Sequence, residues 1–374
     1  MATFRTIDDL EPGRRLPVRI DVNTAVEDGI VQDSRRFASH AETIRELLAD
    51  NHLNHPVEFV ADTYGEDALA AIDDLESGDV LLLENARMCD EELPEEEPDV
   101  KAETDFVRTL APEFDAHVGD AYSAAHRSHA SIVGFPRVMD AYAGRVMEQE
   151  YTAITAVRER EFDGPVTMVL GGTKAEDVIP IIERLDDTVD RFCLGGVVGE
   201  LFLQADGYDV GYDVAETSLF DHQWDDHRGR LERTLEAYRD RLSLPTDLAY
   251  EDDDGERVEA SLERLEKDRP FLDVGSETAD RYADVVEDDD AVFVKGALGV
   301  FEDERFAHGT VTVVSAIVET DCFSVVGGGD IARVVELYDL DEDDFSRVTV
   351  AGGAYVRALT GDPLVGVEIL EGGG

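Results

Sequence analysis

The feature that most constrains this chain is a series of glycine-rich segments, each of which follows an apolar run rich in β-branched residues. Four of them lie in its second half, at Gly171–Lys174, Val294–Glu302, Val325–Asp330 and Ala351–Ala354. An apolar run, then glycines, then a helical pattern is typical of a strand, a tight turn and a helix N-terminus. Because the first N–H groups of a helix bind anions, these segments predict phosphate binding.

The placement of lysine supports that prediction. The sequence has only four lysines, and two of them, Lys174 and Lys295, lie inside the glycine-rich segments. A chain that keeps half of its ammonium groups beside glycines is predicted to bind a phosphate group, and we interpret the ligand as a nucleotide.

Composition excludes several other partners. The 374 residues, 43% of them apolar, suffice for two α/β domains with their own cores. With 87 acidic and 33 basic residues the formal net charge is −54, so nucleic acid and anionic membrane surfaces would be repelled. No segment reaches the apolar length of a membrane span, and the N-terminus lacks a signal-peptide pattern, so we expect a cytoplasmic protein.

The acidic residues are spread along the whole chain. Stretches such as Asp90–Asp99 and Glu251–Glu256 could be disordered tails or metal sites, but we interpret them as solvated surface. Arginine carries most of the positive charge, a pattern that suits a cytoplasm rich in salt. The three cysteines, Cys89, Cys193 and Cys322, are too far apart for a disulfide framework or a metal spacing.

Strands alternating with helices predict the fold class: α/β, with two doubly wound parallel-sheet lobes joined by a long hinge helix. In the first lobe we expect strands at Leu16–Val22, Val57–Ala61, Val80–Leu83 and Ala116–Val118, and helices at Ser39–Leu48 and Lys101–Leu110. A helix at Ala141–Glu161 would join the lobes. In the second lobe we expect strands that start at Val166, Arg191, Asp247, Ala291, Phe323 and Val348.

Arginines stand at the ends of expected strands in the first lobe. Arg19 lies with Asp21 and Asn23 in RIDVN, Arg87 ends ENAR, and Arg127 lies in AHRSHAS. Any one of them is compatible with a surface arginine. Together, at the edge where parallel sheets bind ligands, they indicate a site for a small phosphorylated acid.

The order of these motifs resembles the phosphoglycerate kinase family from end to end. The chain has RIDVN, DSRR, ENAR, DAYSAAHRSHAS, GGTK, GALGVFE, GGGD and GGA, where the family has RxDFN, DxR, ENxR, NDAFxxAHRxHxS, GGAK, NGPxGxFE, GGGD and TGGGA. The resemblance implies a hinge-bending kinase that transfers a phosphoryl group between 1,3-bisphosphoglycerate and ADP, forming 3-phosphoglycerate and ATP, with Mg²⁺ as cofactor.

The resemblance also implies a division of the chain. A substrate lobe would span residues 1–142, with residues 360–374 packing back on it. Residues 143–160 would form the hinge helix and residues 161–359 the nucleotide-binding lobe. The expected partners are 3-phosphoglycerate and the nucleotide, and the expected state is a monomer or weak dimer.

For the substrate, the resemblance implies roles at five positions. Asp21 and Asn23 would hydrogen-bond the hydroxyl and carboxylate end of the glycerate. Arg87 and Arg127 would hold the phosphate that is not transferred. Arg35 would approach the phosphoryl group in flight, where positive charge stabilises the transition state most.

For the nucleotide, Lys174 would contact the transferred group, Asp330 would hold Mg²⁺, and Glu302 would hydrogen-bond the ribose. The turn at Gly352 and Gly353 would aim helix N–H groups at the developing charge. The further nucleotide-binding residues implied are Gly195, Gly196, Gly275, Lys295, Gly299, Gly327, Gly328 and Gly329.

One family motif is missing. The family carries SHxGRP after its second strand, whereas here NHLNHP leads directly into VEFVADTYG. His52 and His55 lie in the gap, but neither is followed by GRP, so we interpret them as loop residues. Either the family's phosphate pocket lacks two of its members here, or the chain is a shortened version, and weaker substrate binding or lost activity is predicted. Inserting the missing segment should restore it.

Three further departures lie in the nucleotide lobe. The family's second lysine, four positions after that of GGAK, is Val178 here, the asparagine of its NGP is Lys295, and the first glycine of its TGGGA is Ala351. We hypothesise that Lys295 replaces the charge lost at Val178, from the opposite wall of the phosphate site. The alternative is a surface lysine.

The leading interpretation is an active phosphoglycerate kinase. The first alternative is a nucleotide-binding homologue that has lost catalysis through the missing segment. A kinase for a different small acid is disfavoured, because Asp21, Asn23, Arg87 and Arg127 are all retained.

Overall fold

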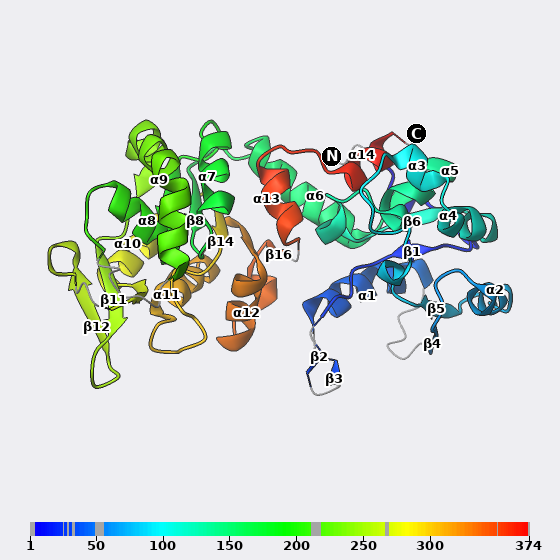
Figure 1. Ribbon diagram of the computed structural model, residues 1–374, viewed down its shortest axis with the longest axis horizontal. Coiled ribbons are helices and arrows are strands. Elements are labelled where there is room, and N and C mark those ends of the chain that lie inside the picture. The colour runs from blue at the N-terminus through cyan, green and yellow to red at the C-terminus, as the bar shows by residue number, and fades with distance from the viewer. Residues whose placement is uncertain are drawn as a thin grey trace. The chain divides into compact units, whose positions relative to one another are not determined.

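The computed structural model describes residues 4–24, 26–27, 30–31, 34–48, 56–210, 218–265, 269–349 and 351–372. It divides into two compact units (Figure 1). Unit 1 contains residues 1–154, 353–358 and 362–374, and unit 2 contains residues 155–352 and 359–361. Each unit contains parallel sheet and helices, so the predicted α/β class is confirmed. His52 and His55 lie outside the described residues.

The sheet structure of unit 1 is divided. Its three-stranded parallel sheet has the order β1 (Val18–Arg19), β6 (His117–Gly119) and β7 (Ala141–Ala143). A separate parallel pair consists of β4 (Val57–Val60) and β5 (Val80–Leu83), and a short antiparallel pair of β2 (Val26–Glu27) and β3 (Ile30–Val31). Of the strand expected at Leu16–Val22, only two residues form β1, whereas β5 has the expected bounds.

The helices of unit 1 are α1 (Arg35–Leu48), α2 (Glu66–Asp73), α3 (Pro98–Ala102), α4 (Asp105–Leu110), α5 (Phe135–Val138), most of α6 (Arg145–Arg158), and α14 (Val365–Glu371). The single helix expected at Lys101–Leu110 is therefore wrong. Thr104 separates α3 from α4, because its side chain accepts a hydrogen bond from the Val107 N–H and so begins a new helix.

The helix expected at Ala141–Glu161 is also shorter than expected. Residues Ala141–Ala143 form β7, and α6 begins only at Arg145. Gly144 stands between them, and a Cβ atom there would collide with the Asp120 side chain. The glycine and the adjacent carboxylate thus fix the point where strand changes to helix.

Unit 2 is built on a six-stranded parallel sheet. Its order is β10 (Leu242–Ser243), β9 (Arg191–Leu194), β8 (Val166–Leu170), β14 (Ala291–Lys295), β15 (Phe323–Gly327) and β16 (Arg347–Thr349). All five residues of β8 are buried, as a central strand covered on both faces requires. Chain order reverses between β8 and β14, the point where such sheets bind ligands.

Helices cover this sheet and supply its core (Figure 1). They are α7 (Ala175–Arg184), α8 (Gly196–Ala205), α9 (Ser218–Tyr238), α10 (Ser276–Glu287), α11 (His308–Val318) and α12 (Gly329–Leu337); α13 (Gly353–Leu359) follows β16 and crosses the boundary between the units. Val294, Val326, Val314 and Val334 belong to one buried cluster, which joins β14 and β15 to α11 and α12.

One expected strand of this series lies elsewhere. Asp247–Glu251 forms β11, but β11 pairs antiparallel with β12 (Arg257–Ser261) and β13 (Phe271–Val274) in a sheet of its own. A tight turn explains this, because the Asp252 carboxylate accepts hydrogen bonds from the Asp254 and Glu256 N–H groups and folds the chain back on itself. None of the described helices is both long and apolar enough to cross a membrane.

Candidate functional site

The end of β1 carries the best-connected of the expected substrate residues. The Asp21 carboxylate accepts hydrogen bonds from the Ser123 hydroxyl and, at 3.1 Å, from the Asn23 N–H, and it lies 3.3 Å from a guanidinium nitrogen of Arg36. Burial acts to raise the pKa of Asp21, but the Ser123 hydrogen bond and the Arg36 charge outweigh it and the pKa is lowered. Asp21 is therefore held as an ionised carboxylate.

The two arginines that begin α1 differ in their surroundings. Arg36 reaches back to the first strand, donating to the Asn23 carbonyl at 3.0 Å as well as pairing with Asp21. Arg35, the residue singled out from the sequence, is half-buried at the first position of α1. Sequence reasoning missed Arg36, although the doubled arginine in DSRR was the signal that two candidates existed.

Arg87 and Arg127 act on the same histidine although 40 residues separate them in the chain. Arg87 is exposed in the turn after β5, and Arg127 is half-buried in the segment after β6. Burial lowers the pKa of His129, and both guanidinium groups act in the same direction. Burial likewise lowers the pKa of Arg19, a half-buried residue on β1, with a smaller contribution in the same direction from Arg87 and opposing contributions from Glu92 and Asp21. Two guanidinium groups thus act on one histidine of unit 1, and positive charge of this kind attracts anions.

An acidic loop supports the segment that carries Arg127. Glu92 is fully buried, and its carboxylate accepts hydrogen bonds from the Ser131 N–H at 2.7 Å and hydroxyl at 2.6 Å. Glu95 accepts one from the Ser128 N–H at 2.8 Å. The interpretation of Asp90–Asp99 as solvated surface is therefore wrong in part, because Glu92 finds enough donors to offset the cost of its burial.

A buried lysine fixes the same loop. The Lys101 ammonium is 0% exposed and donates to the backbone carbonyls of Glu91 at 2.5 Å and Glu92 at 3.2 Å. A Glu96 carboxylate oxygen lies 3.8 Å away. One of the four lysines of the chain thus holds the loop rather than a ligand.

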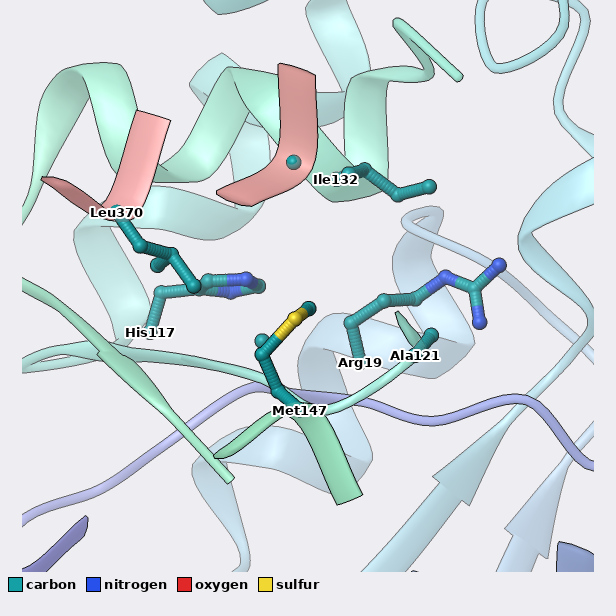
Figure 2. A pocket seen from close by; sticks show the side chains of 8 residues that line it. Arg19, His117, Ala121, Ile132, Met147 and Leu370 are labelled. Atoms are coloured by element: carbon teal, nitrogen blue, oxygen red, sulfur yellow. The ribbon is translucent and has the colours of Figure 1, made fainter. Parts of the chain in front are cut away.

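Unit 1 also contains a cavity of about 10 Å³, lined by eight residues that include Arg19, His117, Met147 and Leu370 (Figure 2). His117 is 2% exposed, and neither ring nitrogen has a hydrogen-bond partner among the described residues. Figure 2 shows the guanidinium of Arg19 directed away from the His117 ring. Burial, with a smaller contribution from Arg19, lowers the pKa of His117 to about 3.

In unit 2 the expected nucleotide residues lie at the carboxyl ends of the parallel strands. Lys174 is exposed and is the N-cap residue of α7, which follows β8. Asp330 is exposed in the first turn of α12, which follows β15. Glu302 is exposed in the turn that follows β14. Because β8, β14 and β15 are adjacent and parallel, these three side chains share one edge of the sheet.

The glycines expected to bind the nucleotide fall into two groups. In the first, protein atoms occupy the space of a side chain: a Cβ atom would lie 2.5 Å from Leu298 Cδ2 at Gly195 and 2.5 Å from the Phe306 carbonyl oxygen at Gly299. The others in this group are Gly196, Gly275 and Gly327. The packing of the protein itself therefore requires glycine at these positions, to which the family resemblance had given a nucleotide-binding role.

In the second group the space is open. A Cβ atom would meet nothing within 4 Å at Gly328, Gly329 or Gly352, and only a His126 ring atom at 4.0 Å at Gly353. Gly328 is the N-cap of α12 and has φ +95°, a conformation that glycine adopts readily. Open backbone at a helix N-terminus is the arrangement that receives a phosphate group.

Lys295 ends β14, and its ammonium lies 3.5 Å from the Asp177 carboxylate in the first turn of α7. Its side chain is 15% exposed, and Val178 next to Asp177 is fully buried. Lys295 therefore faces the helix that carries the position of the missing family lysine. No cluster of three or more potential metal ligands occurs among the described residues.

Comparisons with known proteins identify the family. The profile described as phosphoglycerate kinase matches residues 48–362. The phosphoglycerate kinase of Halorubrum lacusprofundi is 59% identical over 402 aligned positions, covering 99% of this chain and 98% of that protein. That of Haloarcula marismortui is 56% identical over 400 positions, covering 99% and 100%.

Solved structures agree with this result. The phosphoglycerate kinase of Pyrococcus horikoshii has a TM-score of 0.88 at 28% identity, and that of Coxiella burnetii a TM-score of 0.78 at 25% identity. Each comparison covers 98% of both chains. Sequence and structure therefore agree along nearly the whole chain, which belongs to the phosphoglycerate kinase family.

Proposed function

We propose that this chain catalyses the reversible transfer of a phosphoryl group between 1,3-bisphosphoglycerate and ADP, giving 3-phosphoglycerate and ATP in glycolysis. Membership of the family along the whole chain is the observation that carries the proposal. Phosphoglycerate kinases at 53–59% identity cover 99% of the chain. A catalytically impaired homologue, the alternative left open by the sequence, has no support from these relatives.

The phosphoryl transfer requires positive charge beside the phosphates and alignment of the two substrates, and it does not require a general base. An oxygen of the β-phosphate of ADP attacks the acyl phosphorus, and the bond from phosphorus to the carboxyl oxygen breaks. The bonding electrons remain on the carboxylate of 3-phosphoglycerate, so no proton needs to be removed. Positioning and neutralisation of the phosphate oxygens therefore account for the rate.

On the substrate side, we assign Asp21 and Asn23 to the glycerate and Arg87 and Arg127 to the phosphate that stays in place. The joint effect of the two arginines on His129 supports the second assignment. Arg35 was the sequence candidate for the group in flight. The contact between Arg36 and Asp21 favours Arg36 for that role.

On the nucleotide side, we assign Lys174, Lys295 and the open N-terminus of α12 to the phosphates. Asp330 fits Mg²⁺, because its exposed carboxylate stands in the first turn of α12 and Mg²⁺ in kinases takes one or two carboxylates beside the phosphate oxygens. Bound there, Mg²⁺ would neutralise phosphate charge. Glu302 keeps its proposed role at the ribose.

The proposed lobes are residues 1–142 with 360–374, and residues 161–359, with a hinge at 143–160. The division of the chain into two compact units, whose boundary falls within α6 between Ile154 and Thr155, supports two lobes with a hinge there, while residues 353–358 group with unit 1. Contacts of α14 with β7 and α5 support the placement of the C-terminal residues with the substrate lobe.

We further propose that a strand-containing segment of the substrate lobe is absent from this chain. The alignment with the Halorubrum lacusprofundi enzyme has 402 positions, at least 28 more than the 374 residues available here. The family profile begins to match only at residue 48, where α1 ends.

The sheet of unit 1 supports the same proposal. The pair β4–β5 has no hydrogen-bonded ladder with β1–β6–β7 among the described residues. Val57 and Phe59 on β4 are each 56% exposed, although apolar residues in a parallel strand are normally buried on both faces. A further strand beside β4, with the helix that connects it, would extend this sheet and cover such residues.

The experiment is a coupled assay with 3-phosphoglycerate and ATP in molar KCl, on this chain and on a chain that carries the corresponding Halorubrum segment in place of residues 49–55. We expect both to be active and the insertion to lower the KM for 3-phosphoglycerate. A glycine–serine insert of equal length is the control. No turnover by the natural chain would refute the function, whereas an unchanged KM after insertion would refute only the proposal of an absent segment.

The composition and the relatives also bear on where and in what state the enzyme works. We infer a salt-adapted cytoplasmic enzyme that works as a monomer or weak dimer. The net charge of −54 and the haloarchaeal relatives support the adaptation to salt. Activity that rises with KCl and a sedimentation coefficient of a single chain would be the expected results.

A further inference from the structure

The buried side chains of His40 and Asp120 connect Asp21, just after β1, to the first turn of α6. Neither side chain has a role in the proposed phosphoryl transfer. His40 of α1 and Asp120, which follows β6, are 2% and 0% exposed. Their side chains meet with 2.7 Å between His40 Nδ1 and Asp120 Oδ2. Both residues belong to unit 1.

The hydrogen bonds define the state of the His40 ring. The Asp21 N–H donates to His40 Nε2 at 3.1 Å, so Nε2 carries no proton. The proton of the neutral ring is therefore on Nδ1 and is donated to Asp120. Each ring nitrogen has one partner, and the two partners lie on different strand ends.

Asp120 is fixed in turn by the helix. Its other oxygen, Oδ1, accepts hydrogen bonds from the N–H groups of Val146 at 2.9 Å and Met147 at 3.3 Å. Both N–H groups belong to the first turn of α6 and have no partner within the helix. The carboxylate also suits the positive end of the helix dipole. Asp120 thus binds the helix with one oxygen and His40 with the other.

The far end of this series of hydrogen bonds is the proposed substrate residue Asp21. Its side chain is held by Ser123 and Arg36, and its backbone N–H by His40. The peptide that joins Ile20 to Asp21 has two hydrogen bonds: its carbonyl accepts from the Arg19 guanidinium, and its N–H donates to His40. His40 holds the N–H side of this peptide, from which the Asp21 side chain leaves the main chain, and so contributes to the direction of the Asp21 carboxylate.

We propose that His40 is a positioning residue for 3-phosphoglycerate, which holds the Asp21 peptide against the start of α6 through Asp120. The proposal rests on the assignment of Asp21 to the glycerate. In this arrangement Nε2 sets the orientation of Asp21, while Nδ1 fixes the ring. Loss of the first contact should weaken substrate binding, and loss of the second should weaken the fold.

Two amide variants separate these contacts. In His40→Gln the amide oxygen reaches the place of Nε2 and accepts from the Asp21 N–H, while the contact with Asp120 is lost. In His40→Asn the amide reaches the place of Nδ1 and donates to Asp120, while the Asp21 N–H loses its acceptor. His40→Leu loses both, and His308→Leu, at an exposed position at the start of α11, is the control.

The readout is the KM for 3-phosphoglycerate beside that for ATP and the melting temperature. We expect His40→Asn and His40→Leu to raise the KM for 3-phosphoglycerate about tenfold, the effect of one hydrogen bond, with an unchanged KM for ATP. His40→Gln should keep a KM near that of the natural chain despite a lower melting temperature. Equal KM values in the Gln and Asn variants, or KM values that simply follow melting temperature, would overturn the proposal.

Asp120→Asn gives a second test that keeps the ring. If the amide oxygen stays with the N–H groups of α6, its NH₂ group faces Nδ1, and the ring proton moves to Nε2 opposite the Asp21 N–H. We expect the ¹⁵N shifts of His40 to report this tautomer and the KM for 3-phosphoglycerate to rise with it. A changed tautomer with an unchanged KM, or an unchanged tautomer with a raised KM, would contradict a role through His40. Loss of all activity in the natural chain would instead refute the function itself.

Discussion

Replacing His117 with phenylalanine should make the stability of this protein less dependent on pH. The ring of His117 is 2% exposed and stacks on that of Phe135, with centroids 5.7 Å apart. Its pKa is about 3, because burial and the charge of Arg19 disfavour the imidazolium ion. In the unfolded chain a histidine has a pKa of about 6.5.

The direction in which the free energy of unfolding changes with pH follows from the number of protons bound in the folded and unfolded states. Below pH 6.5 the unfolded chain takes up a proton at this position that the folded protein does not bind, so the free energy of unfolding falls as the pH falls towards 3. Between pH 7.5 and pH 5 the loss is about 2 kcal/mol, since 1.36 kcal/mol corresponds to one pH unit and the loss begins near pH 6.5. Phenylalanine binds no proton, and the cavity of about 10 Å³ beside the ring helps to accommodate it.

The assay is urea unfolding of the natural chain and of His117→Phe at pH 7.5 and pH 5 in molar KCl. Carboxylates that titrate in this range contribute equally to both proteins, so their effect cancels in the difference between the variants. We expect the variant to gain about 2 kcal/mol relative to the natural chain on going to pH 5. Parallel losses in the two proteins would refute the conclusion that the fold keeps His117 neutral.

Three further substitutions test the assignments in each unit. Arg36→Met should lower kcat about 100-fold in the coupled assay, the effect of removing one preorganised donor, and a smaller effect than that of Arg35→Met would reverse our preference between the two. Lys295→Met should strongly reduce turnover measured at saturating 3-phosphoglycerate, whereas a near-normal rate would mean that the residue serves only its pair with Asp177. Glu92→Gln should lower the free energy of unfolding by about 1–3 kcal/mol. The two carboxylate oxygens of Glu92 accept separately from the N–H and the hydroxyl of Ser131, and in glutamine an NH₂ donor replaces one of these oxygens. Urea midpoints equal to those of the natural chain would contradict this prediction.

The sequence was sufficient where one local pattern decides the structure. Apolar runs that end in glycine predicted β8, β14 and β15 of the central sheet, and the carboxyl ends of adjacent parallel strands necessarily share an edge. Lys174 and Asp330 were placed on that edge for this reason. Family resemblance then supplied their chemical roles, which strand patterns alone do not contain.

The sequence failed where distant residues decide. Arg35 and Arg36 are neighbours that a helix turns about 100° apart, and only the position of Asp21 distinguishes them. Glu92 belongs to a run of acidic residues typical of solvated surface, and its burial depends on Ser131, 39 positions further along the chain. Asp247–Glu251 had the composition of a parallel strand, but the turn at Asp252 pairs it with β12.

The buried ammonium of Lys101 affects how the stability of unit 1 depends on salt concentration. Carboxylate–guanidinium pairs on the surface, such as that of Arg137 with Asp99, weaken as ions screen them. Lys101 instead binds carbonyl oxygens inside the protein, where mobile ions have little access. On dilution from brine, mutual repulsion of the excess acidic groups grows, yet this internal anchor keeps its strength. The loop bearing Glu92 should thus remain docked until unit 1 as a whole unfolds.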